Sequence, residues 1–197
     1  MKAERDDVRM SDAIPDEELM LRVRNDEVEA LSTLFERHYV SLFNFFYRLS
    51  GDASGSEDLV QEVFYRVLKY RSSYKPGSSF RTWMYQVARN TRSDQYRKRR
   101  GEVELKAAPV AAVLPLDPVD DEQQMARLNY ALMQLPEEKR ELLVLTRFQG
   151  LKYEEVARQL QCEVGAIKVR VHRALQELKE HFHRQAPRSR PQENLEG

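Results

Sequence analysis

The segment from Gly150 to Leu178 contains two amphipathic helical patterns separated by a short break, and this arrangement limits the possible folds most strongly. The first pattern is a set of apolar residues at helical spacing: Tyr153, Val156, Ala157 and Leu160. It predicts a short helix that ends near Gln161. The second pattern is a longer apolar stripe: Ile167, Val171, Ala174, Leu175, Leu178 and Phe182. Two such helices joined by a tight turn are typical of a helix-turn-helix.

Basic residues lie off the apolar stripe, near the N-terminal end of the second predicted helix. They are Lys168, Arg170, His172 and Arg173. In a recognition helix this end meets the base edges of DNA. Any pair of amphipathic helices gives a similar pattern, and a basic face is usually just solvated. The helix-turn-helix interpretation gains weight because Pro136 opens a further helix and Gly150 stands where a C-terminal cap glycine belongs.

The N-terminal half is also predicted to be helical. Its first long helix has apolar residues close to a 3.6-residue period: Leu31, Leu34, Phe35, Leu42, Phe45, Phe46 and Leu49. Gly51 closes that helix, and Ser54 with Glu57 fits a capping box for the next one. The second helix is expected to bury Leu59, Val60, Val63, Phe64, Val67 and Leu68. It displays Asp58, Gln61, Glu62, Tyr65 and Arg66 on a face that is free for a partner.

Residues 80–100, FRTWMYQVARNTRSDQYRKRR, follow a turn-like segment and mix aromatic with basic residues along one predicted helix. Aromatic rings can stack on exposed bases while Arg and Lys hold phosphates, as in single-strand binding. Core spacing is the competing explanation, and it predicts a buried Phe80. Trp83 and Tyr85 fit either role.

Charge is unevenly distributed, although the 197 residues hold 32 basic and 32 acidic side chains and no formal net charge. Basic residues crowd into 81–100 and acidic ones follow, and local charge is what a DNA backbone meets. Residues 101–121 contain Pro109, Pro115 and Pro118 without a helical period. We therefore predict an all-α protein of two small helical domains joined by a flexible linker. The predicted boundaries are a domain at 16–100, the linker at 101–121, a helix-turn-helix domain at 122–183 and a disordered tail at 184–197.

Three segments of this sequence resemble the extracytoplasmic-function sigma factors of bacterial RNA polymerase. They are DLVQEVFYRVLKY at 58–70, the basic-aromatic segment at 80–100, and LPEEKRELLVLTRFQGLKYEEVARQLQCEVGAIKVRVHRAL at 135–175. The resemblance covers most of residues 16–182. It implies a sigma-2-like helical bundle and a sigma-4-like helix-turn-helix domain. It also implies a promoter-specificity subunit that binds core polymerase and promoter DNA, aids duplex melting, catalyses nothing and has an anti-sigma factor as a partner.

The resemblance assigns roles to individual residues. Core-polymerase binding falls to Asp58, Gln61, Glu62 and Tyr65. Promoter melting and the downstream promoter element fall to Trp83, Asn90, Arg92, Asp94 and Arg97, together with the loop at 74–79. For Asp94 we expect an orienting role toward Arg92 and Arg97, because a carboxylate that faces phosphates is repelled. The upstream element falls to Lys168, Val169, Arg170, His172 and Arg173, with Arg170 on phosphate.

The recognition segment departs from the pattern of many relatives, in which Gly-Thr-Val is followed by Lys-Ser-Arg. Here Ala166 and Val169 replace the two hydroxyl residues. Val169 can contact a thymine methyl group but cannot donate a hydrogen bond. We therefore expect the upstream element to differ from the usual A-rich motif of the family.

Two other functional classes remain open. A self-contained helix-turn-helix regulator explains residues 135–180 but leaves the basic-aromatic helix without a role. A nucleic-acid-processing enzyme explains that helix, but the chain lacks clustered carboxylates for metal ions. Glu137, Glu138 and Glu141 suit a solvated first helical turn.

The sequence predicts no cofactor and no metal site. His181 and His183 point to different faces of a helix, and the single cysteine, Cys162, is expected to be a semi-buried packing residue. No apolar run long enough for a membrane span is present, and the first ten residues lack a signal peptide pattern. One cysteine closes no internal disulfide, so we expect a reducing cytoplasm and no membrane insertion.

Overall fold

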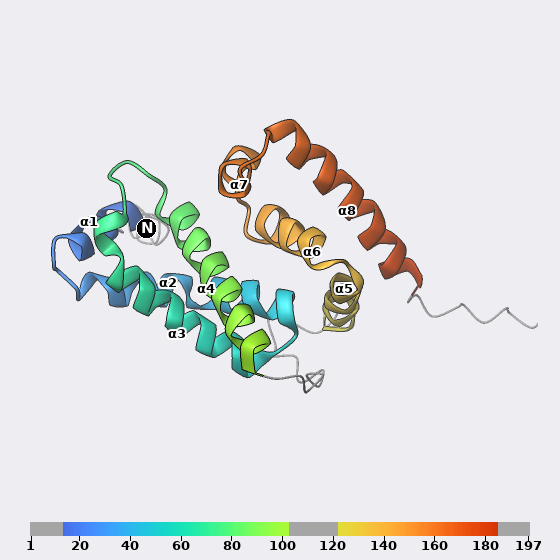
Figure 1. Ribbon diagram of the computed structural model, residues 1–197, viewed down its shortest axis with the longest axis horizontal. Coiled ribbons are helices and arrows are strands. Elements are labelled where there is room, and N and C mark those ends of the chain that lie inside the picture. Colours follow the sequence, from blue (N-terminus) through green and yellow to red (C-terminus); the bar gives the residue numbers. More distant parts are fainter. Residues whose placement is uncertain (1–13, 103–121, 185–197) are drawn as a thin grey trace, which may run out of the picture. The chain divides into compact units, whose positions relative to one another are not determined.

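The computed structural model describes residues 14–102 and 122–184, and every regular element in these ranges is a helix (Figure 1). The predicted all-α class is therefore confirmed. The chain divides into two compact units, residues 1–111 and 112–197. Most of the predicted linker, and the predicted tail beyond Arg184, lie outside the described residues. The exact domain boundaries stay a prediction.

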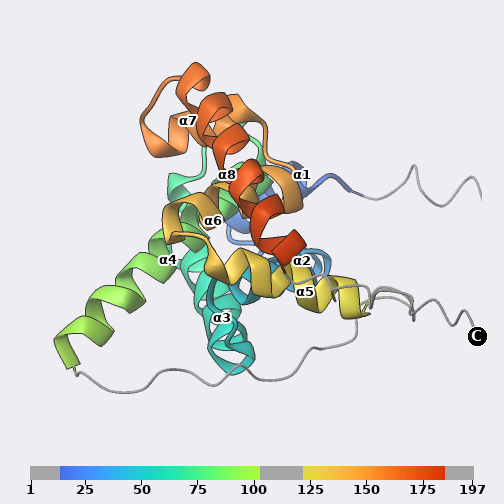
Figure 2. The same cartoon turned by 90° about the vertical axis from the view of Figure 1, so that its right-hand side faces the viewer.

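The first unit is a bundle of long helices. In chain order it contains α1 (Asp16–Arg24), α2 (Ala30–Ser50), α3 (Ala53–Lys69), the short 3-10 helix η1 (Arg71–Ser73) and α4 (Phe80–Glu102). Helix α2 packs against α1 and α3, and α3 packs against α4. In Figure 2 the C-terminal end of α4 runs on beyond α3.

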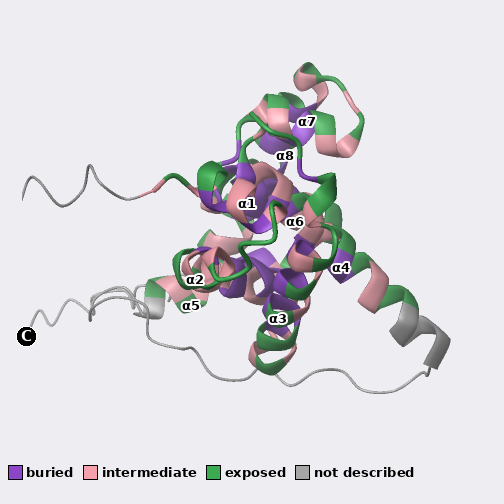
Figure 3. Cartoon of the chain, turned by 90° about the vertical axis from the view of Figure 1, so that its left-hand side faces the viewer, coloured by how far each residue is buried: buried purple, intermediate pink, exposed green. Residues whose placement is uncertain are grey.

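The core of this unit comes from the inward faces of its long helices, and Figure 3 shows the buried residues as purple stretches of these ribbons. Its fully buried members include Leu34, Leu42, Phe45, Phe46, Val60, Val63, Val67, Phe80, Met84 and Tyr85. Burial of one large apolar side chain contributes about 1.5–3 kcal/mol. The expected burial of Phe80 is confirmed, and Tyr85 serves the core rather than an exposed surface.

The junction between α2 and α3 corrects one prediction. Helix α2 ends at Gly51, whose φ of 71° is the left-handed conformation that glycine adopts readily. The residue that caps α3 is Asp52, whose side chain accepts a hydrogen bond of 3.0 Å from the backbone N–H of Gly55. The capping box predicted from Ser54 and Glu57 is therefore wrong, because the helix begins two residues earlier than that box requires.

Polar contacts tie α1 to its neighbours. Asp16 accepts a hydrogen bond of 2.7 Å from Arg37 and pairs at 2.6 Å with the Nε2 atom of His38. Burial raises the pKa of Asp16, but the hydrogen bonds from Arg37 and His38 outweigh burial and hold the pKa below its ordinary value. Glu17 accepts the backbone N–H of Phe80 at 3.1 Å, at the first residue of α4. These contacts fix the N-terminal end of α1.

The second unit contains the predicted helix-turn-helix. Its elements are α5 (Glu122–Gln134), α6 (Glu137–Leu143), the π-helical turn η2 (Val144–Phe148), α7 (Tyr153–Leu160) and α8 (Val164–Arg184). Helix α8 packs against α5, α6 and α7 (Figure 1). Pro136 occupies the position just before the first residue of α6, and Gly150 has a φ of 62° after η2. Both positions match the sequence prediction closely.

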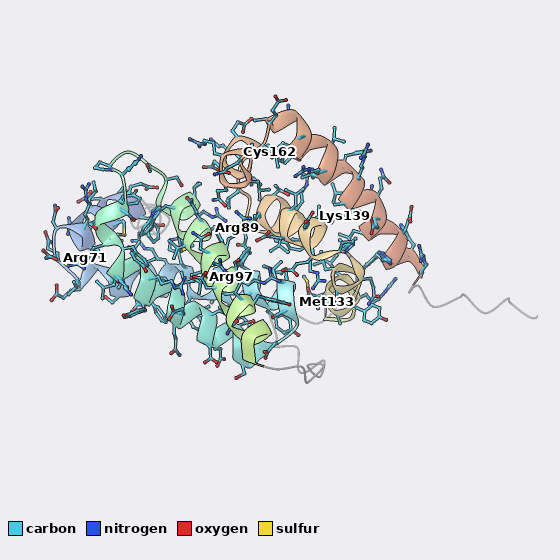
Figure 4. All side chains as sticks on the ribbon, viewed as in Figure 1. Arg71, Arg89, Arg97, Met133, Lys139 and Cys162 are labelled. Carbon is cyan, nitrogen blue, oxygen red and sulfur yellow. The ribbon has the colours of Figure 1, made fainter. Side chains whose placement is uncertain are left out.

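The turn between α7 and α8 begins at Gln161, which has a φ of 52°. The predicted end of the first helix is thus confirmed. On α8 the side chains of Ile167, Val171, Ala174 and Leu178 are buried, whereas Leu175 and Phe182 are half-buried. Cys162 lies in the turn between these helices, half-buried with a free thiol (Figure 4). The predicted apolar stripe is therefore the face that packs on the rest of the unit.

None of the helices within 14–102 and 122–184 is long and apolar enough to cross a membrane.

Candidate polymerase and nucleic-acid interfaces

The residues predicted to bind polymerase form one face of α3. Positions 58, 61, 62 and 65 follow the spacing of neighbours on a helix surface. Asp58 and Gln61 are exposed, Glu62 is partly exposed, and Tyr65 exposes 59% of its surface. The Tyr65 ring has the ammonium group of Lys69 at 5.8 Å from its centroid. The opposite face of α3 is buried, so this face is the side that α3 presents to solvent.

Arg66 connects this α3 face to α4. Its Nε atom donates to Glu62 at 2.6 Å, and its Nη1 atom donates to Asp94 of α4 at 2.5 Å. Burial alone lowers the pKa of Arg66, but its hydrogen bonds to Asp94 and Glu62 outweigh burial and raise the pKa above the ordinary value. One guanidinium therefore joins a residue assigned to polymerase binding and a residue assigned to DNA.

Asp94 also contacts Arg97, one of the two cations that the sequence analysis expected it to orient. Its second carboxylate oxygen accepts a hydrogen bond from Arg97, whose side chain is largely exposed. Hydrogen bonds from Arg66 and then from Arg97 hold the pKa of Asp94 below its usual range. Figure 4 shows Arg97 on the C-terminal half of α4. The sequence alone did not identify Arg66 as a partner of Asp94. The four-residue spacing of Glu62 and Arg66 was a local signal only for the ion pair between those two residues.

Arg92 has a different environment from Arg97. Arg92 is only 6% exposed, and its guanidinium lies 5.2 Å from the centroid of the Tyr96 ring. A cation over an aromatic face is stabilised by the ring quadrupole. In this conformation Arg92 supports α4 and offers little surface to DNA, so its assigned contact with the promoter stays a prediction that needs a side-chain movement.

Trp83 and Asn90 lie on the earlier part of α4. Trp83 is half-buried and packs edge-on against Tyr74, with ring centroids 5.4 Å apart. Its ring centroid is 6.4 Å from that of Phe80. Asn90 is exposed, which leaves its amide available for hydrogen bonding. Trp83 therefore has a partly exposed ring supported by an aromatic cluster.

The loop before α4 is anchored rather than fully exposed. Tyr74 is 1% exposed, and its hydroxyl donates to the backbone carbonyl of Ser78. Burial, with a smaller contribution from the charge of Glu17, raises the pKa of Tyr74 to about 12. The exposed positions of this loop are Lys75, Pro76, Gly77 and Ser79.

The residues predicted to read the upstream element are all on the solvent side of α8. Lys168, Val169, Arg170, His172 and Arg173 are exposed, with Val169 exposing 50% of its surface. They lie in the first half of α8, opposite the buried stripe. An exposed basic helix end of this kind can enter a major groove.

One pair beside this helix was not singled out from the sequence. Arg147 is exposed, and its Nη2 atom donates to the Tyr153 hydroxyl at 2.8 Å. The two residues come from η2 and from the start of α7. The pair adds a further cation to the helix-turn-helix unit. Arg147 and Tyr153 stand on either side of Gly150 in two different elements, so helical periodicity does not predict their contact.

No group of three or more His, Cys, Asp and Glu side chains in the described part of the chain is arranged to hold a metal ion.

Comparison with known proteins identifies both units. Residues 34–102 match Sigma-70 region 2, and residues 125–178 match Sigma-70 region 4. The bundle with the α3 and α4 faces and the helix-turn-helix unit thus define a sigma factor of the sigma-70 type.

The relatives place the chain more narrowly. The ECF RNA polymerase sigma factor EcfG of Rhodopseudomonas palustris is 40% identical over 143 residues, which cover 70% of this chain and 77% of EcfG. The RNA polymerase sigma factor CarQ of Myxococcus xanthus is 32% identical, over 82% of this chain and 94% of CarQ. The sigma factor RpoE from Bartonella quintana, solved in complex with the anti-sigma factor NepR, is 28% identical with a TM-score of 0.65. That alignment covers 77% of this chain and 97% of RpoE.

The chain belongs to the extracytoplasmic-function (ECF) sigma factors. It is a promoter-specificity subunit of bacterial RNA polymerase, which binds the core enzyme and promoter DNA and directs transcription initiation.

Proposed function

We propose that the α3 face formed by Asp58, Gln61, Glu62 and Tyr65 is the surface by which this sigma factor binds core polymerase. The observation that carries the proposal is the exposure of Tyr65 on an acidic and polar helix face. A large exposed aromatic ring on such a face is typical of an interface anchor. The surrounding carboxylates suit a basic partner and would speed its association.

Two further surfaces contact the promoter. Trp83, Asn90, Asp94 and Arg97 on α4 act on the downstream element and on duplex opening, with Arg92 joining them if its side chain leaves Tyr96. The exposed half of α8 reads the upstream element through Lys168, Val169, Arg170, His172 and Arg173. Support comes from the exposure of these α8 side chains and from the partly exposed Trp83 ring on the basic helix α4.

The chain itself catalyses nothing and acts in the cytoplasm, where promoter DNA and polymerase are found. It has no cofactor in this role. An anti-sigma factor is a further partner, because the relative from Bartonella quintana was captured with one. The domains correspond to residues 16–100 and 122–183, with residues 101–121 as the linker between them.

The polymerase-binding face is tested by single substitutions on α3. Tyr65→Ala is expected to raise the Kd for core polymerase by about tenfold to a hundredfold, because removing an interface anchor costs roughly 1.4–2.8 kcal/mol. The measurement is equilibrium binding of fluorescently labelled sigma factor to core polymerase, with helicity checked by circular dichroism.

Glu29→Ala is the control for charge removal, because Glu29 is exposed, precedes α2 and is not one of the residues of the proposed α3 face. It should bind core polymerase as the wild type does, while Asp58→Ala should weaken binding. An unchanged Kd for both Tyr65→Ala and Asp58→Ala would rule out this face as the polymerase-binding surface.

A further inference from the structure

Arg66 stands between two surfaces that serve different partners. Glu62 belongs to the α3 face proposed for polymerase, and Asp94 belongs to the α4 surface proposed for the promoter. The Arg66 guanidinium donates to both carboxylates, at 2.6 Å to Glu62 and at 2.5 Å to Asp94. The sequence places Arg66 on the exposed side of α3 but assigns it no contact with polymerase or DNA.

The geometry makes this bridge difficult to replace. The Arg66 side chain is only 19% exposed, so solvent screens its ion pairs less than it screens pairs on the open surface. A guanidinium is planar and permanently charged, and it presents separate N–H groups in a fixed fork. It can therefore hold two carboxylates at once, whereas an ammonium group offers a single charged point.

The bridge continues into the DNA-facing surface. Asp94 uses one oxygen for Arg66 and the other for Arg97. Asn90, Asp94 and Arg97 are spaced by four and three residues, so they lie on neighbouring positions of one α4 face. The position of the exposed Arg97 side chain thus depends on Asp94, and the position of Asp94 depends on Arg66.

We infer that Arg66 is a positioning residue that couples polymerase binding on α3 to promoter contact on α4. A basic group of polymerase that approaches Glu62 competes with Arg66 for that carboxylate. Arg66 then interacts with Asp94 alone, which fixes the position of the Asp94 carboxylate and, through it, the position of the Arg97 guanidinium. This inference rests on the roles proposed above for Glu62 and Arg97, and it adds a link between them.

A double-mutant cycle between Arg66 and Arg97 tests the link. The chains compared are wild type, Arg66→Gln, Arg97→Gln and the double variant, each with saturating core polymerase. The readout is the fraction of promoter opened, followed by a fluorescent base analogue in the downstream element. The effect of Arg97→Gln is expected to be between about threefold and thirtyfold smaller on the Arg66→Gln background, which lies within the range found for groups in one network.

Arg22→Gln is the matched control. Arg22 also pairs with an acid four residues earlier, Glu18, at 2.7 Å, but on α1. Its loss should leave the effect of Arg97→Gln unchanged. A purely structural role of Arg66 would lower the thermal midpoint and scale every variant equally, and would not alter the effect of Arg97→Gln. If Arg66→Gln fails to fold, Arg66→Lys keeps the cation but not the fork, and it is expected to show the same loss of coupling.

The outcomes separate the two proposals. If Arg97→Gln impairs opening equally on both backgrounds, Arg66 does not couple the surfaces and this inference is wrong. If Arg97→Gln leaves opening unchanged in the otherwise wild-type chain, the proposed role of Arg97 is wrong, and the inference is overturned with it. Coupling in the cycle together with unchanged Arg22→Gln behaviour supports both.

Discussion

Arg170 and Arg173 are both exposed on the first half of α8, yet we expect them to act on different parts of DNA. A contact to a base edge depends on the base pair, whereas a contact to phosphate does not. Arg173→Ala should cost about 1–3 kcal/mol on the correct upstream element and relax the preference at one position. Arg170→Ala should weaken binding to every sequence alike and reduce the salt slope by about 1.

The measurement is binding of promoter fragments by holoenzyme across a range of salt concentrations, with a panel of single base-pair changes in the upstream element. Lys179→Ala provides the control, since Lys179 is exposed farther along the same helix. A uniform loss of affinity across the panel for Arg173→Ala would indicate that Arg173 contacts phosphate. Val169, Lys168 or His172 would then be the base-reading residues.

Single side chains also show where the sequence misleads. The basic and aromatic composition of residues 80–100 suggested exposed rings and cations together. In the structure Tyr85 is fully buried and Arg92 is nearly so, while Arg97 is open to solvent. Composition alone cannot separate these residues, because the separation depends on which side of α4 faces α3. Asn90 and Arg97, which lie away from the core, keep the accessibility that the prediction needs.

At the level of helices, the cap of α3 provides a direct test of the local structure. Asp52→Ala removes the side chain that accepts the Gly55 N–H and should destabilise the first unit by about 1 kcal/mol. Ser54→Ala should change the free energy of unfolding by less than about 0.5 kcal/mol, because Ser54 is exposed and caps nothing.

Urea denaturation followed by circular dichroism measures both variants. Equal losses of unfolding free energy for Asp52→Ala and Ser54→Ala would contradict the observed start of α3 and favour the capping box of Ser54 and Glu57.

Gly55→Ala is a further check on the same cap. A Cβ atom at Gly55 would collide with the Asp52 carboxylate, so this variant should displace the carboxylate and weaken its cap hydrogen bond.

The helices that periodicity predicted are those with a regular apolar stripe, namely α2, α3, α7 and α8. A stripe is a local property of the sequence, and it survives in the fold because each helix buries that stripe against neighbours. The π-helical turn at 144–148 and the bridge from Arg66 to Asp94 had no such local pattern. The first depends on a shift of backbone hydrogen bonding, and the second joins residues on two helices that meet only after folding.

Across the whole chain, zero net charge conceals separate surfaces of opposite character. Carboxylates gather on the exposed face of α3, while cations gather on the outer side of α8. A nucleic-acid backbone and a basic protein partner each meet the local charge and not the average. The same neutrality therefore accommodates both kinds of partner, with the α3 face proposed for polymerase and the α4 and α8 surfaces proposed for promoter DNA.

The central claim is that this chain, once bound to core polymerase, selects promoters through its two helical units. Run-off transcription from a pool of promoter fragments, with core polymerase supplied with or without the chain, tests it most directly. We predict discrete transcripts only when the chain is present, lost in Tyr65→Ala at limiting concentration and redistributed among promoters in Arg173→Ala. Absence of binding to core, with sequence-specific duplex binding by the chain alone, would contradict this account and indicate a self-contained helix-turn-helix regulator.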